Sequence, residues 1–221
     1  MNNKLLEDGN RILLETDNED ELLLQFTDDL VDSRGHVKGN VKIKGSTSAQ
    51  IAAHLYKVLS SYHLPVRFKN QKSSKDLTVK RATLFPFYNV LTNIEDEDGA
   101  MTSKLEFVLV DEKSEEVVEL NALLKDGLAT QAQLTEVRRY SLKMNVILID
   151  FFQRRGLKLL GFKAHFGILP NEKIGLCSEL TLDSCDVKDA NSRTKYTTAY
   201  MISHIDDAAE LYEKAVSTIL Y

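Results

Sequence analysis

The stretch from residue 156 to residue 186 carries side chains that could bind a phosphate group or a cation. It reads GLKLLGFKAHFGILPNEKIGLCSELTLDSCD. Apolar residues before and after the turn at Pro170–Asn171 predict a β-hairpin, in which Lys163 could hold a phosphate group. His165 and Glu179 would lie on facing strands and form a weak cation site or an ordinary cross-strand contact. Because Mg²⁺ prefers oxygen ligands to imidazole, this pair would make a poor magnesium site.

Hydrophobic periodicity and turn residues predict the elements that must position this stretch. In chain order these are strands at about 11–16 and 22–27, a helix in 44–65 stopped by Pro65, two strands in 66–94 with a bend at Pro86, a strand at 104–111, helices in 117–127 and 130–156, the hairpin, and a closing helix at 204–221. Gly156 marks the end of the longest helix. No internal repeat or low-complexity linker interrupts the order, which indicates an α+β fold.

Composition excludes several classes of function. The 221 residues are 43% hydrophobic and 28% charged, enough for one ordinary core or two small lobes. A formal net charge of -5 offers no basic surface for nucleic acid. Cys177 and Cys185 lack the spacing of a zinc site or a disulfide framework and are expected to be reduced thiols. No signal peptide or membrane-length apolar segment is visible, so we expect a cytoplasmic protein without a membrane partner.

Five blocks of sequence, in order and at compatible spacing, resemble the SAICAR synthetase family. The blocks are LLEDGNRILLETDNEDELLLQFTDDL, IKGSTSAQIAAHLYKVL with LPVRF after it, LTVKRATLFPFYNVLTN, YSLKMNVILIDFFQRRGLKLLGFKAHFG, and LCSELTLDSCDVKD. Members of that family are ATP-dependent ligases of purine biosynthesis, which join aspartate to a carboxylated phosphoribosyl-aminoimidazole. The resemblance covers nearly the whole chain, although a shared fold does not guarantee a shared activity.

The resemblance implies a two-lobed α+β fold with a nucleotide-sized cleft between the lobes. Residues 1–80 would form an antiparallel N-terminal lobe of the nucleotide-binding type, and residues 81–221 a central and C-terminal α+β lobe. The candidates for binding a nucleotide or its phosphates are Arg11, Lys80, Leu84, Phe85, Lys163 and Glu179, and the candidates on the substrate side are Asn93 and Asp183. Arg11, Lys80 and Lys163 are expected to face the cleft, and Leu84–Phe85 aligns with the segment that meets adenine.

Several charged positions of the family are replaced in this chain. Its two magnesium-holding carboxylates align with His165 and Ser178, and one substrate-binding arginine aligns with Asp186. Either a bound phosphate-bearing small molecule or the new acids Asp32 and Asp186 could neutralise the cations of the cleft, and the acids are favoured because they stand where the substrate's negative charges would lie. The sequence therefore assigns no catalytic residue and no metal site beyond the weak His165–Glu179 pair.

Two functions follow from these substitutions. The favoured one is a diverged member of the family with lost or altered ligase activity, acting through a remodelled pocket or through a protein partner. The alternative is an active ATP-dependent amide ligase, either SAICAR synthetase or an enzyme for a related imidazole or nucleotide substrate. The ligand would be a nucleotide or an imidazole ribotide, and ATP and magnesium would be cofactors only if the ligase activity is retained. A homo-oligomer or a complex with an active paralogue is a third expectation.

Overall fold

Two five-stranded antiparallel sheets organise the protein. The computed structural model describes residues 3–98, 101–111 and 114–221. Its elements are β1 (Lys4–Glu7), β2 (Arg11–Glu15), β3 (Glu21–Phe26), β4 (Asp29–Val31), β5 (Val37–Asn40), α1 (Lys44–Ser61), β6 (Phe68–Gln71), β7 (Asp76–Lys80), β8 (Thr83–Leu84), β9 (Phe87–Glu95), β10 (Met101–Asp111), β11 (Ser114–Val118), α2 (Leu120–Lys125), α3 (Gln131–Gln153), β12 (Leu157–Ala164), β13 (Phe166–Ile168), β14 (Ile174–Leu176), β15 (Cys185–Asp189), α4 (Thr198–Ser203), the 3-10 turn η1 (Ile205–Asp207) and α5 (Ala208–Leu220). The strand orders are β1-β2-β3-β7-β6 and β11-β10-β9-β12-β15.

The N-terminal sheet and α1 form where the local patterns predict them. Strands β2 and β3 make the expected hairpin, with Arg11 paired to Phe26. Leu22, Leu24 and Phe26 point into the core because side chains alternate along a strand. Helix α1 ends at Ser61, before the predicted stop at Pro65. The expected hairpin is therefore confirmed, and the helix ends one turn early.

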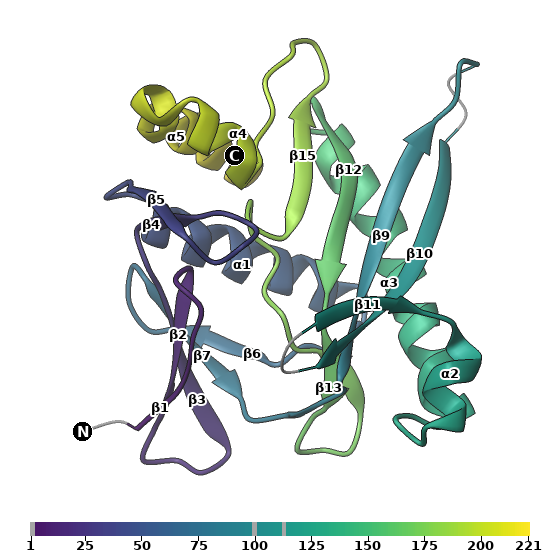
Figure 1. Ribbon diagram of the computed structural model, residues 1–221. Coiled ribbons are helices and arrows are strands. Elements are labelled where there is room, and N and C mark those ends of the chain that lie inside the picture. The colour runs from purple at the N-terminus through teal and green to yellow at the C-terminus, as the bar shows by residue number, and fades with distance from the viewer. Residues whose placement is uncertain (1–2, 99–100, 112–113) are drawn as a thin grey trace.

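The second sheet is backed by the long helix α3 (Figure 1). Thr130 and Gln133 form a reciprocal capping box at its start, which satisfies two of the free amide groups there. The chain leaves the helix through Gly156, whose φ of 67° favours glycine. The predicted helix is confirmed, including its glycine stop.

Two predicted elements differ from the structure. The strand predicted to run through residues 157–167 breaks at His165: β12 pairs with β9 and β15, whereas β13 joins β8 and β14 in a small separate sheet. The hairpin is therefore limited to β13 and β14. Val117 and Val118, predicted to begin a helix, end strand β11 instead, because β10 offers a partner edge that periodicity cannot reveal.

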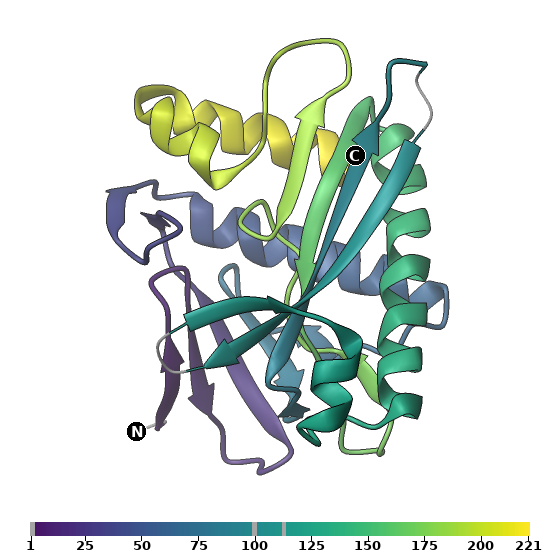
Figure 2. The same cartoon turned by 45° about the vertical axis from the view of Figure 1, so that its right-hand side comes forward.

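The C-terminal helix returns to the N-terminal half of the chain. In both views α5 lies alongside α1 (Figure 2), and it buries Ala208, Tyr212, Ala215 and Ile219. A continuous hydrophobic core therefore connects the two sheets. The α+β class is confirmed, and the boundary between lobes at residue 80 stays a prediction. Among the residues described, no helix has the length and apolar character needed to cross a membrane.

Candidate functional site in the cleft between the sheets

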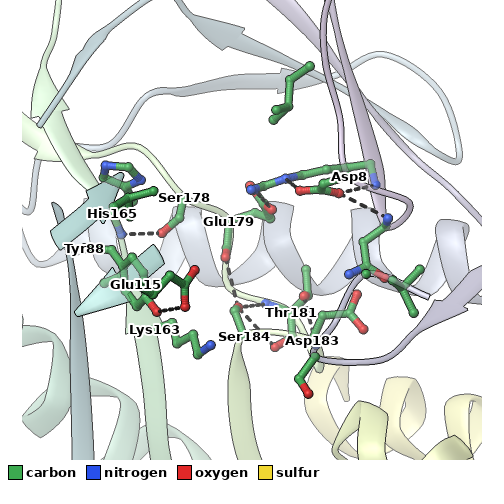
Figure 3. Close-up of a pocket in the computed structure, with 18 of the residues that line it drawn as sticks. Asp8, Tyr88, Glu115, Lys163, His165, Ser178, Glu179, Thr181, Asp183 and Ser184 are labelled. Carbon is green, nitrogen blue, oxygen red and sulfur yellow. Dashed lines mark hydrogen bonds and ion pairs between the residues drawn. The ribbon is translucent and has the colours of Figure 1, made fainter. Parts of the chain in front are cut away.

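A cleft of about 550 Å³ lies between the N-terminal sheet and the second sheet (Figure 3). Its walls come from β1 and β2, the loop after β4, Leu84, strands β9 to β11, and the segment from Lys163 to Ser184. The cleft is large enough for a ligand of nucleotide size. Of the candidates for binding nucleotide, phosphate or substrate, Arg11, Leu84, Lys163, Glu179 and Asp183 line it, and so do His165, Ser178 and Asp32.

Glu179 is held at the floor of the cleft by two arginines. Arg11 Nη1 makes an ion pair with Glu179 Oε1, and Arg67 Nη2 lies 3.5 Å from Glu179 Oε2. Arg11 Nε also donates to Asp8 Oδ2 at 2.8 Å. Burial raises the pKa of Glu179, but the guanidinium groups of Arg11 and Arg67 outweigh it and hold that pKa below its ordinary value. Glu179 is therefore an ionised carboxylate whose charge is already paired.

His165 is a neutral residue at the junction between β12 of the second sheet and β13 of the small sheet. Its ring Nε2 lies 2.6 Å from the carbonyl oxygen of Phe85, so Nε2 must carry the hydrogen, since a carbonyl only accepts. Its backbone amide donates to Ser178 Oγ at 2.8 Å. Burial, and then the nearby Arg67 and Arg11, lower the pKa of His165. The expected His165–Glu179 cation site is thus not formed, because the imidazole bonds to the backbone and the carboxylate to arginine.

The buried His165 predicts a pH dependence of stability. The folded state keeps a pKa below the ordinary 6.5, so unfolding becomes more favourable as the pH falls below 6.5 and the unfolded chain takes up a proton. We expect the melting temperature of His165→Gln to fall less than that of the parent between pH 7 and pH 5. Burial also lowers the pKa of His54, which leaves the variant a residual slope of the same sign.

Differential scanning fluorimetry across this pH range would measure the effect. His63→Asn is the matched control, because His63 is exposed and has a φ of 59°, which asparagine adopts readily. Equal slopes for the parent and His165→Gln would contradict the assignment of a neutral, buried imidazole.

Asp183 belongs to a buried polar network at one end of the cleft. Lys44 Nζ donates to Asp183 Oδ2 at 3.0 Å and to Asn10 Oδ1 at 3.1 Å, and its side chain is fully buried. Thr198 Oγ1 donates to Asp183 Oδ1 at 2.5 Å. Each carboxylate oxygen of Asp183 therefore has a partner within the protein, although the residue also borders the cleft.

Asn93 lies in the core and not in the cleft, contrary to its predicted substrate-side position. Its amide donates to Asn145 Oδ1 at 2.9 Å, and its Oδ1 accepts from Asn145 and from Ser103 Oγ at 2.9 and 2.8 Å. The residue is 6% exposed. The asparagine pair joins the second sheet to α3, which is a structural role.

Truncation of this network is expected to affect stability and not binding. Asn93→Ala should lower the free energy of unfolding by about 2 kcal/mol, because it removes the donor to the buried Asn145 Oδ1 and one of the acceptors of Asn145 Nδ2. Urea denaturation would measure the loss, and a titration with ADP should give the same affinity as the parent. Asn121→Ala, at an exposed position of α2, is the matched control. A weakened ADP affinity with unchanged stability would restore the predicted substrate-side role.

Two more predicted positions are corrected. Lys80 borders a separate surface hollow beside His63 and Leu169 and is not part of the cleft lining. Phe85 is buried and stacks on Phe87, and its amide donates to Phe166 O at 3.1 Å while its carbonyl accepts from His165. Its backbone is thus used within the protein, so only the half-exposed Leu84 of this pair faces the cleft.

The sequence analysis did not identify two residues, Tyr88 and Glu115, on the wall of the cleft opposite Arg11. Tyr88 Oη donates to Glu115 Oε2 at 2.8 Å, and Lys163 Nζ lies 5.6 Å from the centre of the Tyr88 ring. Lys163 is exposed and has no ion-pair partner within the described part of the chain. No local signal identifies Glu115, because the β10–β11 pairing brings it to the site. Lys44 and Arg67 did have a signal, since both fall in the quoted blocks IKGSTS and LPVRF.

The residues of the cleft do not fit a protein-bound magnesium ion. Five acids line it, and each has a partner: Asp8 with Arg11, Asp32 with Lys38, Glu115 with Tyr88, Glu179 with two arginines, and Asp183 with Lys44. No three His, Cys, Asp or Glu side chains of the described ranges converge as a metal site.

Asp186 lies exposed on β15, so the predicted neutralisation of the cleft cations by Asp32 and Asp186 is wrong. Glu179 and Asp8 neutralise Arg11 instead.

A two-lobed α+β protein with a nucleotide-sized cleft is the class that this fold and site define. The family model for SAICAR synthetase matches residues 5–217. The chain belongs to the SAICAR synthetase family, as the resemblance implied. Phosphoribosylaminoimidazole-succinocarboxamide synthase of Trichodesmium erythraeum is 30% identical over an alignment of 200 residues, which covers 84% of this chain and 82% of that protein. The enzyme of the same name from Aquifex aeolicus is 29% identical over 201 residues, covering 86% and 93% of the two chains.

Solved structures of the family share the whole fold. The synthase of Ehrlichia chaffeensis superposes with a TM-score of 0.89 at 23% identity, over 98% of both chains. A SAICAR synthetase in complex with ADP gives the same TM-score at 21% identity, over 98% of this chain and 97% of the other. Because the sequence identities to these structures are low, the comparison supports a shared fold and nothing further.

Proposed function

We propose that this protein is an ATP-dependent carboxylate–amine ligase of the SAICAR synthetase type. Membership of the family carries the proposal, together with the cleft that Arg11 and Lys163 line between the two sheets. The relatives are named as synthases, and one related structure holds ADP. ATP and an imidazole ribotide, both anionic, would share the cleft.

The cleft residues can position such ligands. Leu84 and Leu6 present apolar side chains against which a base could lie. Lys163 offers an unpaired ammonium group to a phosphate or carboxylate, and Arg11 keeps Nη2 free of hydrogen-bond partners among the described residues. ATP would supply the phosphoryl group that activates a carboxylate before an amine displaces it. The fixed cations then stabilise the anionic groups in place without rearrangement.

An assay of coupled turnover tests this function. The purified protein, supplied with ATP, Mg²⁺, an amino acid and a carboxylated aminoimidazole ribotide, should release ADP only when all components are present. Mass spectrometry should identify the amide product, with aspartate as the first amino acid to try. ADP release that does not depend on the presence of the ribotide, or no ADP release at all, would contradict the proposal.

A second candidate is a family member with lost or altered ligase activity. The pairing of Glu179 with Arg11 and Arg67 favours it, because this carboxylate is then not available to a metal ion. His165 and Ser178 at the aligned magnesium positions point the same way. Under this alternative ADP or a ribotide binds the cleft, but the complete mixture gives no amide.

A further inference from the structure

The floor of the cleft holds a buried Arg–Glu–Arg cluster formed by Arg11, Glu179 and Arg67. Arg67 and Glu179 are 6% and 7% exposed, whereas the Arg11 side chain is 25% exposed and reaches the cleft. The cluster contains two guanidinium groups and one carboxylate. Asp8 also pairs with Arg11, so two guanidinium groups face two carboxylates, and what the floor offers to an anion is its guanidinium N–H groups and not a net charge.

The charged groups around the cluster differ in how they act on the cleft. Asp8 contacts Arg11 from the solvent side, where its side chain is 37% exposed, so water and salt screen it. Asp183 is compensated by the fully buried Lys44. On the facing wall, Lys163 has no ion-pair partner among the described residues and Glu115 is bonded to Tyr88, so this wall carries one charge of each sign.

Some hydrogen-bonding groups of the cluster have no partner within the described part of the protein. Arg67 Nε and Glu179 Oε2 are both buried without a hydrogen-bond partner in the described part of the protein, because the 3.5 Å between Arg67 Nη2 and Glu179 Oε2 is longer than a hydrogen bond. A small cavity of about 70 Å³ beside Arg67, Arg11 and Ser178 leads toward these groups. An anion, or the water that hydrates one, can satisfy such donors, whereas a metal ion would be repelled by them.

We propose that the Arg11–Glu179–Arg67 cluster takes the place of a protein-bound metal ion, so that the phosphate groups of a nucleotide bind in this cleft without any divalent cation. Arg11 Nη2 and Lys163 Nζ make the direct contacts, and Arg67 keeps Glu179 from opposing them. The inference rests on the proposed function only for the ligand class, a nucleoside di- or triphosphate. A divalent ion can still enter as part of the nucleotide, held by the phosphates alone.

Calorimetric titrations with ADP, in excess EDTA and in excess Mg²⁺, test the proposal. The affinities in the two conditions should agree within about threefold, since the protein adds no ligand to the ion. Arg11→Gln should weaken the metal-free affinity by about tenfold through the loss of a charge-assisted contact. Arg81→Gln, which removes an exposed arginine paired with Glu15, is the matched control and should bind as the parent does.

Three results would overturn the proposal: ADP binding that requires Mg²⁺ or gains more than about tenfold from it, an Arg11→Gln variant that binds as tightly as the parent, or no binding of ADP and of pyrophosphate in EDTA. Circular dichroism establishes that each variant is folded. The turnover assay separates this inference from the proposed function. Amide synthesis with strictly magnesium-dependent ADP binding rejects the inference alone, whereas metal-free ADP binding without synthesis rejects the ligase alone.

Discussion

Asp183→Asn is expected to lower the free energy of unfolding by about 3 to 5 kcal/mol, because the substitution leaves the ammonium group of Lys44 buried without a counter-charge. Lys44 is fully buried, and Asp183 is its only carboxylate partner among the described residues. The amide of asparagine has nearly the same shape, so the loss reports charge and hydrogen bonding and not volume. Urea denaturation followed by circular dichroism would measure it.

A second substitution distinguishes a buried charge from general damage to the network. Lys44→Met/Asp183→Asn removes both charges and should recover part of the stability that the single change loses, since an uncharged pair needs no compensation. Glu95→Gln breaks the exposed Lys158–Glu95 pair and should leave the unfolding midpoint almost unchanged. A double variant that is less stable than Asp183→Asn would contradict this account of the network.

Glu179→Gln is expected to change stability and binding in opposite directions. Removing the carboxylate leaves the buried Arg67 uncompensated, which should cost about 3 to 5 kcal/mol of unfolding free energy. The same change frees Arg11 for a ligand and should raise the metal-free affinity for ADP by about tenfold. Denaturation and calorimetry on one preparation would measure both effects.

Glu115→Gln is the matched control for that experiment. It removes one negative charge from the opposite wall of the cleft, where the carboxylate bonds to Tyr88 and to no described cation. It should leave stability nearly unchanged and strengthen ADP binding less than Glu179→Gln does. If Glu179→Gln instead weakens binding, Glu179 contacts the ligand or an ion that accompanies it, and the cluster is not a substitute for a metal.

Local sequence patterns predicted strands that pair with a neighbour in the sequence and helices whose apolar spacing extends over many residues. The hairpin of β2 and β3 follows from alternation around an acidic turn, and α3 follows from helical spacing and a terminal glycine. The break at His165 was not predictable, because an apolar strand looks the same whether it stays in one sheet or enters another. Only the pairings with β9 and β8, distant in sequence, decide it.

The candidate site could also be predicted only in part, because some of its contacts join residues that are distant in sequence. The resemblance placed Arg11, Lys163 and Glu179 at the cleft, and all three line the cleft between the sheets; their role in binding stays a prediction. It could not show that Glu179 is paired with Arg67, because such a contact depends on side-chain directions across two lobes. Lys80 and Asn93 were misplaced because alternation alone does not say which face of a strand meets the cleft and which meets the core.

The packing of α5 on α1 has a consequence for the order in which the protein is made. Helix α1 is synthesised well before α5, yet Tyr212 and its neighbours on α5 cover part of the apolar surface of α1. Until α5 has emerged from the ribosome, that surface of α1 stays exposed, which favours chaperone binding or aggregation of the nascent chain. The N-terminal half therefore cannot complete its packing before α5 is made.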